Sequence, residues 1–309
     1  MTRSPFRESA LSEPSTRLRD LIGGVAAREV ILAAAGVKVA RIALTDLELG
    51  KVASILVGLG LEATRSPRKY VSRPDRGKGG FSNRFASRHP QGHPEARWLL
   101  YIARSREEAE SARRGEEGGS SDLFGDLLGY PPCCVAWYAI SWPLAEQRHQ
   151  GDLFPLAHQA TPVGVAGHAL LNFGANYFGG GWTSFFPCSL TCTAAIAYLR
   201  REREEVCRRA PSLVDQADEE SALPLVYAEY RGVAQLRGTE VDKRAHVLRY
   251  DPGRLTITLP APRGSLWRSM LNGDTLRPIG VFGLDVLRGA RVLHRERRGD
   301  AFLRWFSRS

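Results

Sequence analysis

The pattern of apolar and polar residues predicts regular structure within the first third of the chain. The apolar run Val39–Leu44 has the length of a short buried strand. It is followed by Thr45-Asp46-Leu47-Glu48, a capping box in which the threonine and glutamate side chains satisfy free N–H groups at a helix start. We therefore expect a helix from this box to about Leu59.

A second set of elements follows. Residues 62–72 have an extended pattern, and Trp98–Ala103 (WLLYIA) is a candidate buried strand. Ser105-Arg106-Glu107-Glu108 is another capping box, and the charged helix after it is expected to end near Gly115. The order strand–helix–strand–strand–helix over residues 21–118 predicts a small α+β unit with ferredoxin-like topology.

The rest of the chain divides into regions of different pattern. Residues 1–20 have no sustained hydrophobic period and predict a disordered tail. Small residues at 118–121 mark a boundary, after which residues 119–215 have a mostly helical pattern. Short apolar segments separated by turn residues predict a β-rich region over 216–309. The expected fold class is α+β.

A long segment between two predicted strands, Arg73–Arg97, is rich in glycine, proline, arginine and histidine. Segments of this length without regular structure are either functional or disordered. Basic residues such as Arg84 and Arg88 would suit an anionic partner. A solvated hairpin tip explains the same composition.

Composition narrows the classes of function only a little. The 309 residues carry a formal net charge of +10, which suits an anionic substrate or nucleic acid, although an ordinary solvated surface explains it more simply. The chain has no apolar run long enough to span a membrane and no secretory signal pattern, so we expect a cytoplasmic protein. It also lacks the motifs of P-loop nucleotide-binding proteins, serine hydrolases and zinc proteases.

Four of the five cysteines form two pairs that follow proline. The string LGYPPCCVAWY places Cys133 and Cys134 after prolines that suit the first turn of a helix. In FFPCSLTCTAA, the spacing of Cys188 and Cys192 predicts that they share one face near a helix start. Helix N-termini favour thiolates, the form that binds metal. Because cytosolic cysteines stay reduced, we expect one metal site rather than disulfides.

The identity of the metal rests on the adjacent pair. Four thiolates suit zinc, [2Fe–2S] or [4Fe–4S]. Adjacent residues Cys133 and Cys134 are expected to reach two corners of a larger cluster more easily than two corners of one small tetrahedron. This favours an iron–sulfur cluster, [4Fe–4S], with zinc as the alternative.

Other interpretations of the cysteines stay open. Three of the four would suffice as ligands, which would leave an open iron for a substrate. Four unrelated buried thiols or a redox dithiol are the remaining alternatives. Cys207 lies in a heavily charged helical stretch and is expected to lie outside the site.

Two further residues are candidates for proton transfer. Tyr130 precedes Cys133 closely and would hydrogen-bond to sulfur or donate a proton, although its ring would also pack against Trp137. His168 precedes an apolar stretch and would serve as a proton donor or ligand, whereas most such histidines are hydrogen-bonded core residues. Three glycines at 179–181 indicate a backbone that approaches a neighbour closely, either a substrate, a cluster or a packed helix.

The two cysteine strings, LGYPPCCVAWY and FFPCSLTCTAA, resemble the paired signature of the domain-of-unknown-function 483 proteins of prokaryotes. The resemblance covers roughly residues 120–200. It implies an intracellular prokaryotic protein with a shared cysteine site at Cys133, Cys134, Cys188 and Cys192. It implies no particular reaction.

Two hypotheses of function follow. The first is an enzyme of small-molecule metabolism, an iron–sulfur oxidoreductase or lyase, whose basic loop orients an anionic substrate. The second is a zinc-stabilised module that binds nucleic acid. It rests on arginines and aromatic residues interleaved near the C-terminus, namely Arg288, Arg291, Arg295, Arg297, Arg298, Arg304 and Arg308 with His294, Phe302, Trp305 and Phe306.

Overall fold

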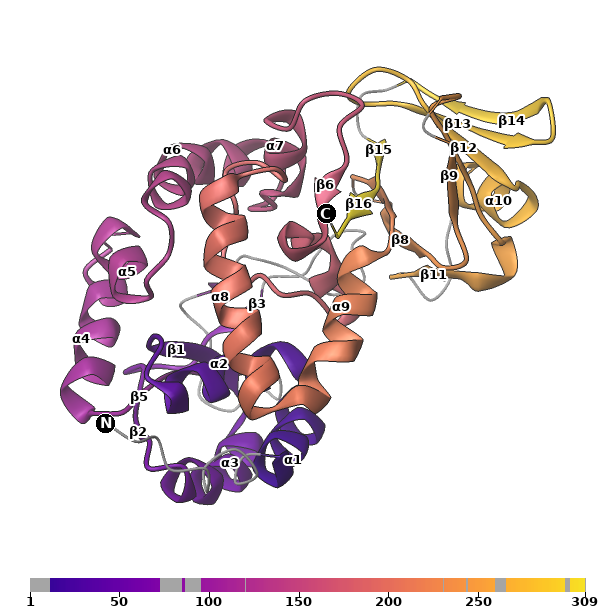
Figure 1. Cartoon of the computed structure of the whole chain (residues 1–309). Coiled ribbons are helices and arrows are strands. Elements are labelled where there is room, and N and C mark those ends of the chain that lie inside the picture. Colours follow the sequence, from indigo (N-terminus) through magenta and orange to yellow (C-terminus); the bar gives the residue numbers. More distant parts are fainter. Residues whose placement is uncertain are drawn as a thin grey trace.

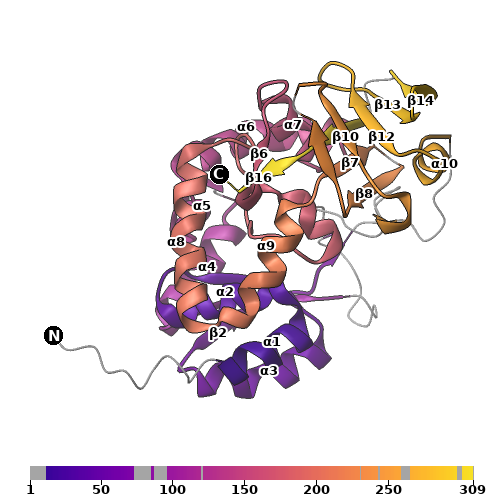
Figure 2. The same cartoon turned by 45° about the vertical axis from the view of Figure 1, so that its right-hand side comes forward.

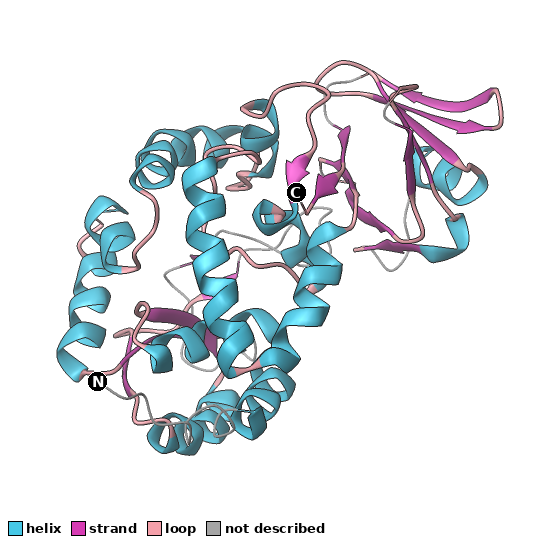
Figure 3. Ribbon diagram, viewed as in Figure 1, coloured by secondary structure: helices cyan, strands magenta, loops and turns pink. Residues whose placement is uncertain are grey.

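The structure is a computed structural model of the whole chain, and it describes residues 12–72, 85–86, 96–119, 121–229, 231–242, 244–258, 265–297 and 301–308. Helices make up most of the first two thirds of the chain, and strands gather in the last third (Figures 1 and 3). The molecule is therefore a mixed α+β protein, which confirms the predicted fold class.

The helices surround a small sheet in the N-terminal part and continue into the central part. None of those that the structure describes combines the length and the apolar character needed to cross a membrane. The α-helices are α1 Ser12–Ile22, α2 Gly24–Ala35, α3 Asp46–Gly58, α4 Arg106–Glu117, α5 Ser121–Leu127, α6 Pro132–Arg148, α7 Phe154–Gln159, α8 Thr193–Arg209, α9 Val214–Ala222 and α10 Ser265–Asn272. Short 3₁₀ turns are η3 Ala169–Leu171, η4 Phe173–Phe178, η5 Pro211–Leu213 and η6 Pro252–Arg254.

Both capping boxes form as the sequence predicts. The Thr45 side chain accepts the N–H of Glu48, whose carboxylate in turn accepts the N–H of Thr45, and α3 starts there. Ser105 and Glu108 make the same reciprocal pair at the start of α4. The helix α4 continues two residues past the predicted end at Gly115.

The N-terminal sheet consists of β1 (Ala40–Leu44), β5 (Trp98–Ala103) and β2 (Glu62–Arg65), in that order. The central strand β5 is antiparallel to both neighbours. A ferredoxin-like unit needs a fourth strand in the same sheet, and this sheet has three. The ferredoxin-like topology is therefore not confirmed. Among the described residues, the other two strands before β5, β3 (Val71–Ser72) and β4 (Phe85–Ala86), form a separate two-stranded sheet.

Part of the segment predicted to be a disordered tail is helical. Residues 12–20 belong to α1, whose Leu18 is fully buried, whereas residues 1–11 lie outside the described part of the chain. Most of the basic segment 73–97, including Arg84 and Arg88, also lies outside the described residues.

The C-terminal region is built from antiparallel strands, as its pattern predicts. One sheet has the order β14-β13-β12-β10-β9, and another has the order β11-β8-β7-β15. The last strand, β16, returns to the central region and pairs in parallel with β6 (Figure 2). The strands are β6 Gly167–His168, β7 Leu225–Ala228, β8 Gly232–Leu236, β9 Glu240–Asp242, β10 Val247–Arg249, β11 Leu255–Ile257, β12 Thr275–Pro278, β13 Leu284–Arg288, β14 Arg291–Glu296, β15 Ala301–Arg304 and β16 Phe306–Ser307.

One hydrophobic core crosses the boundary predicted near residue 118. It joins buried side chains of α1, α2, α3, β1 and β5 to those of α8 and α9, and it includes Cys134 and the aromatic residues Trp182, Phe185 and Tyr198. The N-terminal sheet and the central helices therefore fold against each other. The C-terminal sheets enclose a second core around Trp267.

A buried ion network lies in the first core. The Lys38 ammonium, whose side chain is 1% exposed, lies 2.9 Å from Glu29 of α2 and 2.9 Å from Glu202 of α8. Burial disfavours the charge on Lys38, but Glu202 and Glu29 outweigh this effect and hold the pKa of the lysine well above its ordinary value. The network fixes α2 against α8.

Replacement of Lys38 by methionine tests this role. Lys38→Met leaves two carboxylates buried without their cation, so we expect the free energy of unfolding to fall by about 3–5 kcal/mol in urea denaturation. The control is Lys51→Met, at an exposed position of α3, which should change stability by less than about 0.5 kcal/mol. Equal losses for the two variants would contradict a structural role for the network.

Candidate metal centre

The four paired cysteines come together in space, as the sequence predicts. Every one of their sulfurs lies within 4.8 Å of the other three. The Sγ of Cys133 is 3.9 Å from that of Cys134 and 3.7 Å from that of Cys192, and the Cys134 and Cys192 sulfurs are 3.9 Å apart. The remaining member is Cys188. Four thiols at these separations form a compact group that is compatible with a metal ion.

The first pair sits at the start of α6. Pro132 occupies the first turn, where its missing N–H costs no hydrogen bond. Cys134 and Val135 both donate their N–H groups to the carbonyl of Pro131. Cys133 and Cys134 are therefore held in the first helical turn, as predicted, with Cys134 in the core and Cys133 exposed.

The second pair differs from the prediction in one respect. The helix α8 begins at Thr193, with Cys192 as its N-cap residue, so Cys188 lies in the preceding loop and not on the same helical face. A turn between the two, closed by the Cys192 N–H on the Ser189 carbonyl, brings both sulfurs to one side. The helix start carries one thiol of this pair instead of two.

Two buried groups hold this turn through Leu190. The Leu190 N–H donates to the hydroxyl of Thr161 at 2.9 Å, and its carbonyl accepts the N–H of His168 at 2.8 Å. Thr161 in turn donates its hydroxyl to the carbonyl of Ala157 in α7. Both backbone groups of Leu190, the middle residue between Cys188 and Cys192, are thus fixed by the surrounding chain.

The thiols experience opposing influences on their ionisation. Burial raises the pKa of Cys134 well above the ordinary thiol value, although the backbone N–H of Cys188 acts against this rise. Burial also raises the pKa of Cys188 to about 12. At Cys192 burial is outweighed by the N–H of Ala195 and the neighbouring thiols, so its pKa lies below the ordinary value. The helix start of α8 thus favours a thiolate.

Tyr130, one of the two candidates for proton transfer, contacts groups other than the cysteine sulfurs. The Tyr130 hydroxyl donates to the Ser184 carbonyl at 3.3 Å, and its ring stacks on Phe185. Burial raises the pKa of Tyr130 to about 12. Its packing partner is therefore Phe185 rather than Trp137. Proton transfer by Tyr130 stays a prediction.

His168 is a buried residue of β6 whose backbone N–H donates to the Leu190 carbonyl in the turn between Cys188 and Cys192. Its Nδ1 accepts the N–H of Leu170, and its Nε2 lies 3.5 Å from a guanidinium nitrogen of Arg200. Burial and this arginine lower the pKa of His168, so the ring is neutral near pH 7. The group of potential metal ligands contains only the four cysteines within the described residues. A catalytic role for His168 stays a prediction.

Two of the three glycines, Gly180 and Gly181, lie against close neighbours. A Cβ on Gly180 would lie 2.5 Å from the Cβ of Glu220 in α9, and Gly181 has φ +97°. The Gly181 carbonyl accepts a hydrogen bond from the buried guanidinium of Arg28. The backbone at these glycines therefore lies close to α9 and to the Arg28 side chain of α2.

Several arginines of the C-terminal region have partners within the chain. Arg295 pairs with the buried carboxylate of Asp285, and Arg304 donates to His158 and to the Val165 carbonyl. Arg308 donates to the Asp218 carbonyl. Nucleic-acid binding by this region stays a prediction, with fewer free cations to support it.

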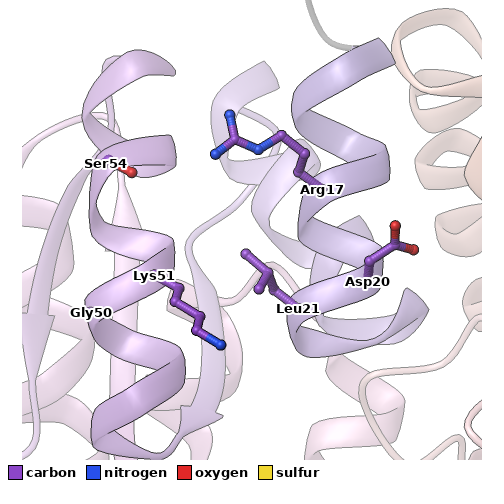
Figure 4. A pocket seen from close by; sticks show the side chains of 6 residues that line it. All are labelled: Arg17, Asp20, Leu21, Gly50, Lys51 and Ser54. Carbon is purple, nitrogen blue, oxygen red and sulfur yellow. The ribbon is translucent and has the colours of Figure 1, made fainter.

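A surface pocket lies between α1 and α3 (Figure 4), on helices other than those that carry the cysteines. It is lined by Arg17, Asp20, Leu21, Gly50, Lys51 and Ser54. It combines both signs of charge on an open surface, so it gives no argument for a particular ligand.

The groups that position the cysteine segments leave only a weak signal in the sequence. Lys38 donates to the Ser184 hydroxyl at 3.2 Å and lies 5.6 Å from the ring centre of Tyr130. The signal was a lone lysine beside valines in Val37-Lys38-Val39, and a lone glutamate, Glu29, in the apolar helix α2.

Comparison of the chain with protein-family models, with curated proteins and with solved structures found no match. The likeness to the domain-of-unknown-function 483 proteins therefore stays a prediction. The cysteine group itself is the observation that indicates a function for the chain.

Substitution of Thr161 tests how the cysteine turn is held. Thr161→Val removes the acceptor of the buried Leu190 N–H, so we expect the free energy of unfolding to fall by about 1–3 kcal/mol. Thr256→Val makes the same chemical change at an exposed position of β11 and should alter stability by less than about 0.5 kcal/mol. Chemical denaturation of both variants measures the difference. An equal response would show that the hydroxyl of Thr161 does not hold the turn.

Proposed function

We propose that the chain is a zinc-binding protein in which one ion is held by Cys133, Cys134, Cys188 and Cys192. The observation that carries this proposal is the spacing of the sulfurs. Sulfurs about 2.3 Å from a tetrahedral zinc ion stand about 3.8 Å from one another. The separations among the Cys133, Cys134 and Cys192 sulfurs, 3.7, 3.9 and 3.9 Å, fit this value, and the Cys188 sulfur lies within 4.8 Å of each of them.

The same spacing favours zinc over the iron–sulfur cluster that the sequence favoured. In a [4Fe–4S] cluster each thiolate binds a different iron atom, and sulfide lies between the irons. The thiolate sulfurs therefore stand clearly farther apart than those around one ion. In a [2Fe–2S] cluster the thiolates on different irons are separated in the same way. A group in which all sulfurs lie within 4.8 Å of one another suits a single ion better.

The adjacency of Cys133 and Cys134 is also no reason to prefer a cluster over a single ion. Cys133 and Cys134 were expected to have difficulty reaching two corners of one tetrahedron. Their sulfurs are 3.9 Å apart, the length of a tetrahedron edge around zinc. The turn at the start of α6 directs both side chains to one side, so adjacency is no obstacle to a single ion.

The coordination suggests a structural role for the ion. Structural zinc sites have four protein ligands, whereas catalytic sites keep one position for water or substrate. All four cysteines lie close enough to bind, which supports a closed site. Such an ion would fasten the start of α6 to the start of α8. The alternative of three ligands and an open position has no particular support from this spacing.

Metal analysis after purification without oxygen tests the proposal. We expect about one zinc per chain, little iron or acid-labile sulfide, and no visible absorption. Replacement of zinc by cobalt(II) should give the intense visible bands of a tetrahedral thiolate site. Iron and sulfide in stoichiometric amounts would contradict the proposal and support a cluster, and a chain that binds no metal would contradict both.

Serine substitutions identify the ligands. Cys134→Ser and Cys192→Ser each remove a ligand, and we expect the zinc content to fall by more than half after dialysis. Cys207→Ser, at an exposed position of α8 outside the group, is the matched control and should retain the metal. Retention of zinc by both ligand variants would exclude the proposed site.

Removal of the ion should also weaken the fold. Because metal binding at a structural site contributes to folding, we expect a strong chelator to lower Tm by at least about 5 °C. Added zinc should restore it. The C134S variant should show no response to the chelator in the same thermal assay.

A further inference from the structure

The four sulfurs of the proposed zinc site are not equivalent in exposure. Cys134 is 2% exposed and packs in the first core, whereas Cys188 and Cys192 are partly buried against it. Cys133 is exposed on the outer side of α6. A molecule from solution can therefore reach the Cys133 sulfur more easily than the other three sulfurs.

The sulfurs also differ in their hydrogen bonds. The backbone N–H of Cys188 acts on the Cys134 sulfur, and that of Ala195 acts on the Cys192 sulfur. A hydrogen bond to a thiolate draws charge from sulfur and makes it a weaker nucleophile. Within the described part of the chain, the contacts of the Cys133 sulfur are with the sulfurs of Cys134 and Cys192. Its exposure, together with these contacts, sets Cys133 apart from the other three sulfurs.

The residues that neighbour Cys133 along α6 are uncharged. Ala136 and Ile140 lie three and seven residues further along α6, on the same helical face, and both are exposed, Ile140 to 73%. Neither the stretch 128–145 nor the stretch 185–199 contains an acidic or basic residue or a histidine. Four thiolates on one zinc ion carry a net charge of −2. This combination would repel an anionic reagent and accept an uncharged one.

From these observations we propose that Cys133 is an alkyl-group acceptor, which reacts as a zinc-bound thiolate with uncharged alkyl electrophiles. The proposal rests on the proposed zinc site. A lone pair of the Cys133 sulfur forms a bond to the alkyl carbon, and the bond from that carbon to its leaving group breaks. The leaving group departs with the bonding electrons. No proton moves, because the thiolate carries none, and Cys133 becomes a thioether.

The test uses two alkylating reagents of similar size and different charge, iodoacetamide and iodoacetate. The zinc-loaded full-length protein is treated with each, and the modified cysteines are identified over time by peptide mass spectrometry. Zinc is measured in the same samples. Cys207 serves as the internal reference, since it is an exposed thiol outside the cysteine group. It lies between Arg203 and Arg208 in the charged stretch of α8.

We expect iodoacetamide to modify Cys133 at least about tenfold faster than Cys134, Cys188 or Cys192. The rate of iodoacetamide divided by that of iodoacetate should be several-fold larger at Cys133 than at Cys207. Chelation of zinc should reduce the preference for Cys133 over the other three and leave the rate at Cys207 unchanged.

The outcomes separate the two proposals. Bound zinc together with equal or slower reaction at Cys133 would overturn the acceptor role and leave the zinc site intact. Bound zinc with equal reagent preference at Cys133 and Cys207 would overturn the selectivity for uncharged electrophiles. A chain that binds no zinc in these samples would overturn both the zinc site and the acceptor role.

Discussion

The burial of Lys38 between two carboxylates is the constraint on which the central part of the molecule depends. Removal of such charges from water costs several kcal/mol per ion, so the network is tolerable only when its members meet at short distance. Glu29 and Glu202 supply this from α2 and α8, each at 2.9 Å. Lys38 also contacts Ser184 and lies over the ring of Tyr130. Ser184 and Tyr130 shortly precede the two cysteine pairs, so one ammonium group orders both segments.

The cysteine group and the ion network share α8, which the cysteines join to α6 and the network joins to α2. Cys134 belongs to the core that also contains Tyr198 and Phe185, whereas Cys133 reaches the surface. The segments around the cysteines contain no charged residue to balance thiolates. Balance comes instead from backbone N–H groups, such as that of Ala195 at the start of α8. A bound cation of charge +2, as in the proposed zinc site, would offset half of the charge of four thiolates, and backbone N–H groups would stabilise the rest.

The sequence predicted those features of the structure that depend on residues close together in the chain. The capping boxes at Thr45 and Ser105 involve residues three positions apart, so their pattern alone located the starts of α3 and α4. The proline-led start of α6 was foreseen for the same reason, and the grouping of the four cysteines followed from their chemistry. What the pattern could not provide was long-range geometry. The three-stranded sheet and the partners of Lys38 depend on contacts between distant segments. The separation of adjacent sulfurs depends on side-chain conformation, which residue spacing does not determine.

Closure of the coordination sphere decides where any chemistry at this centre takes place. A metal with an open position acts on a bound molecule directly, whereas a metal with four thiolates has no such position. Reactivity at such a site would then pass to the ligands, and it would be greatest at the sulfur that is most accessible from solution. Because the fold buries Cys134 and partly buries Cys188 and Cys192, Cys133 would be the most accessible ligand of the proposed site. The packing that stabilises the site thereby also selects its reactive atom.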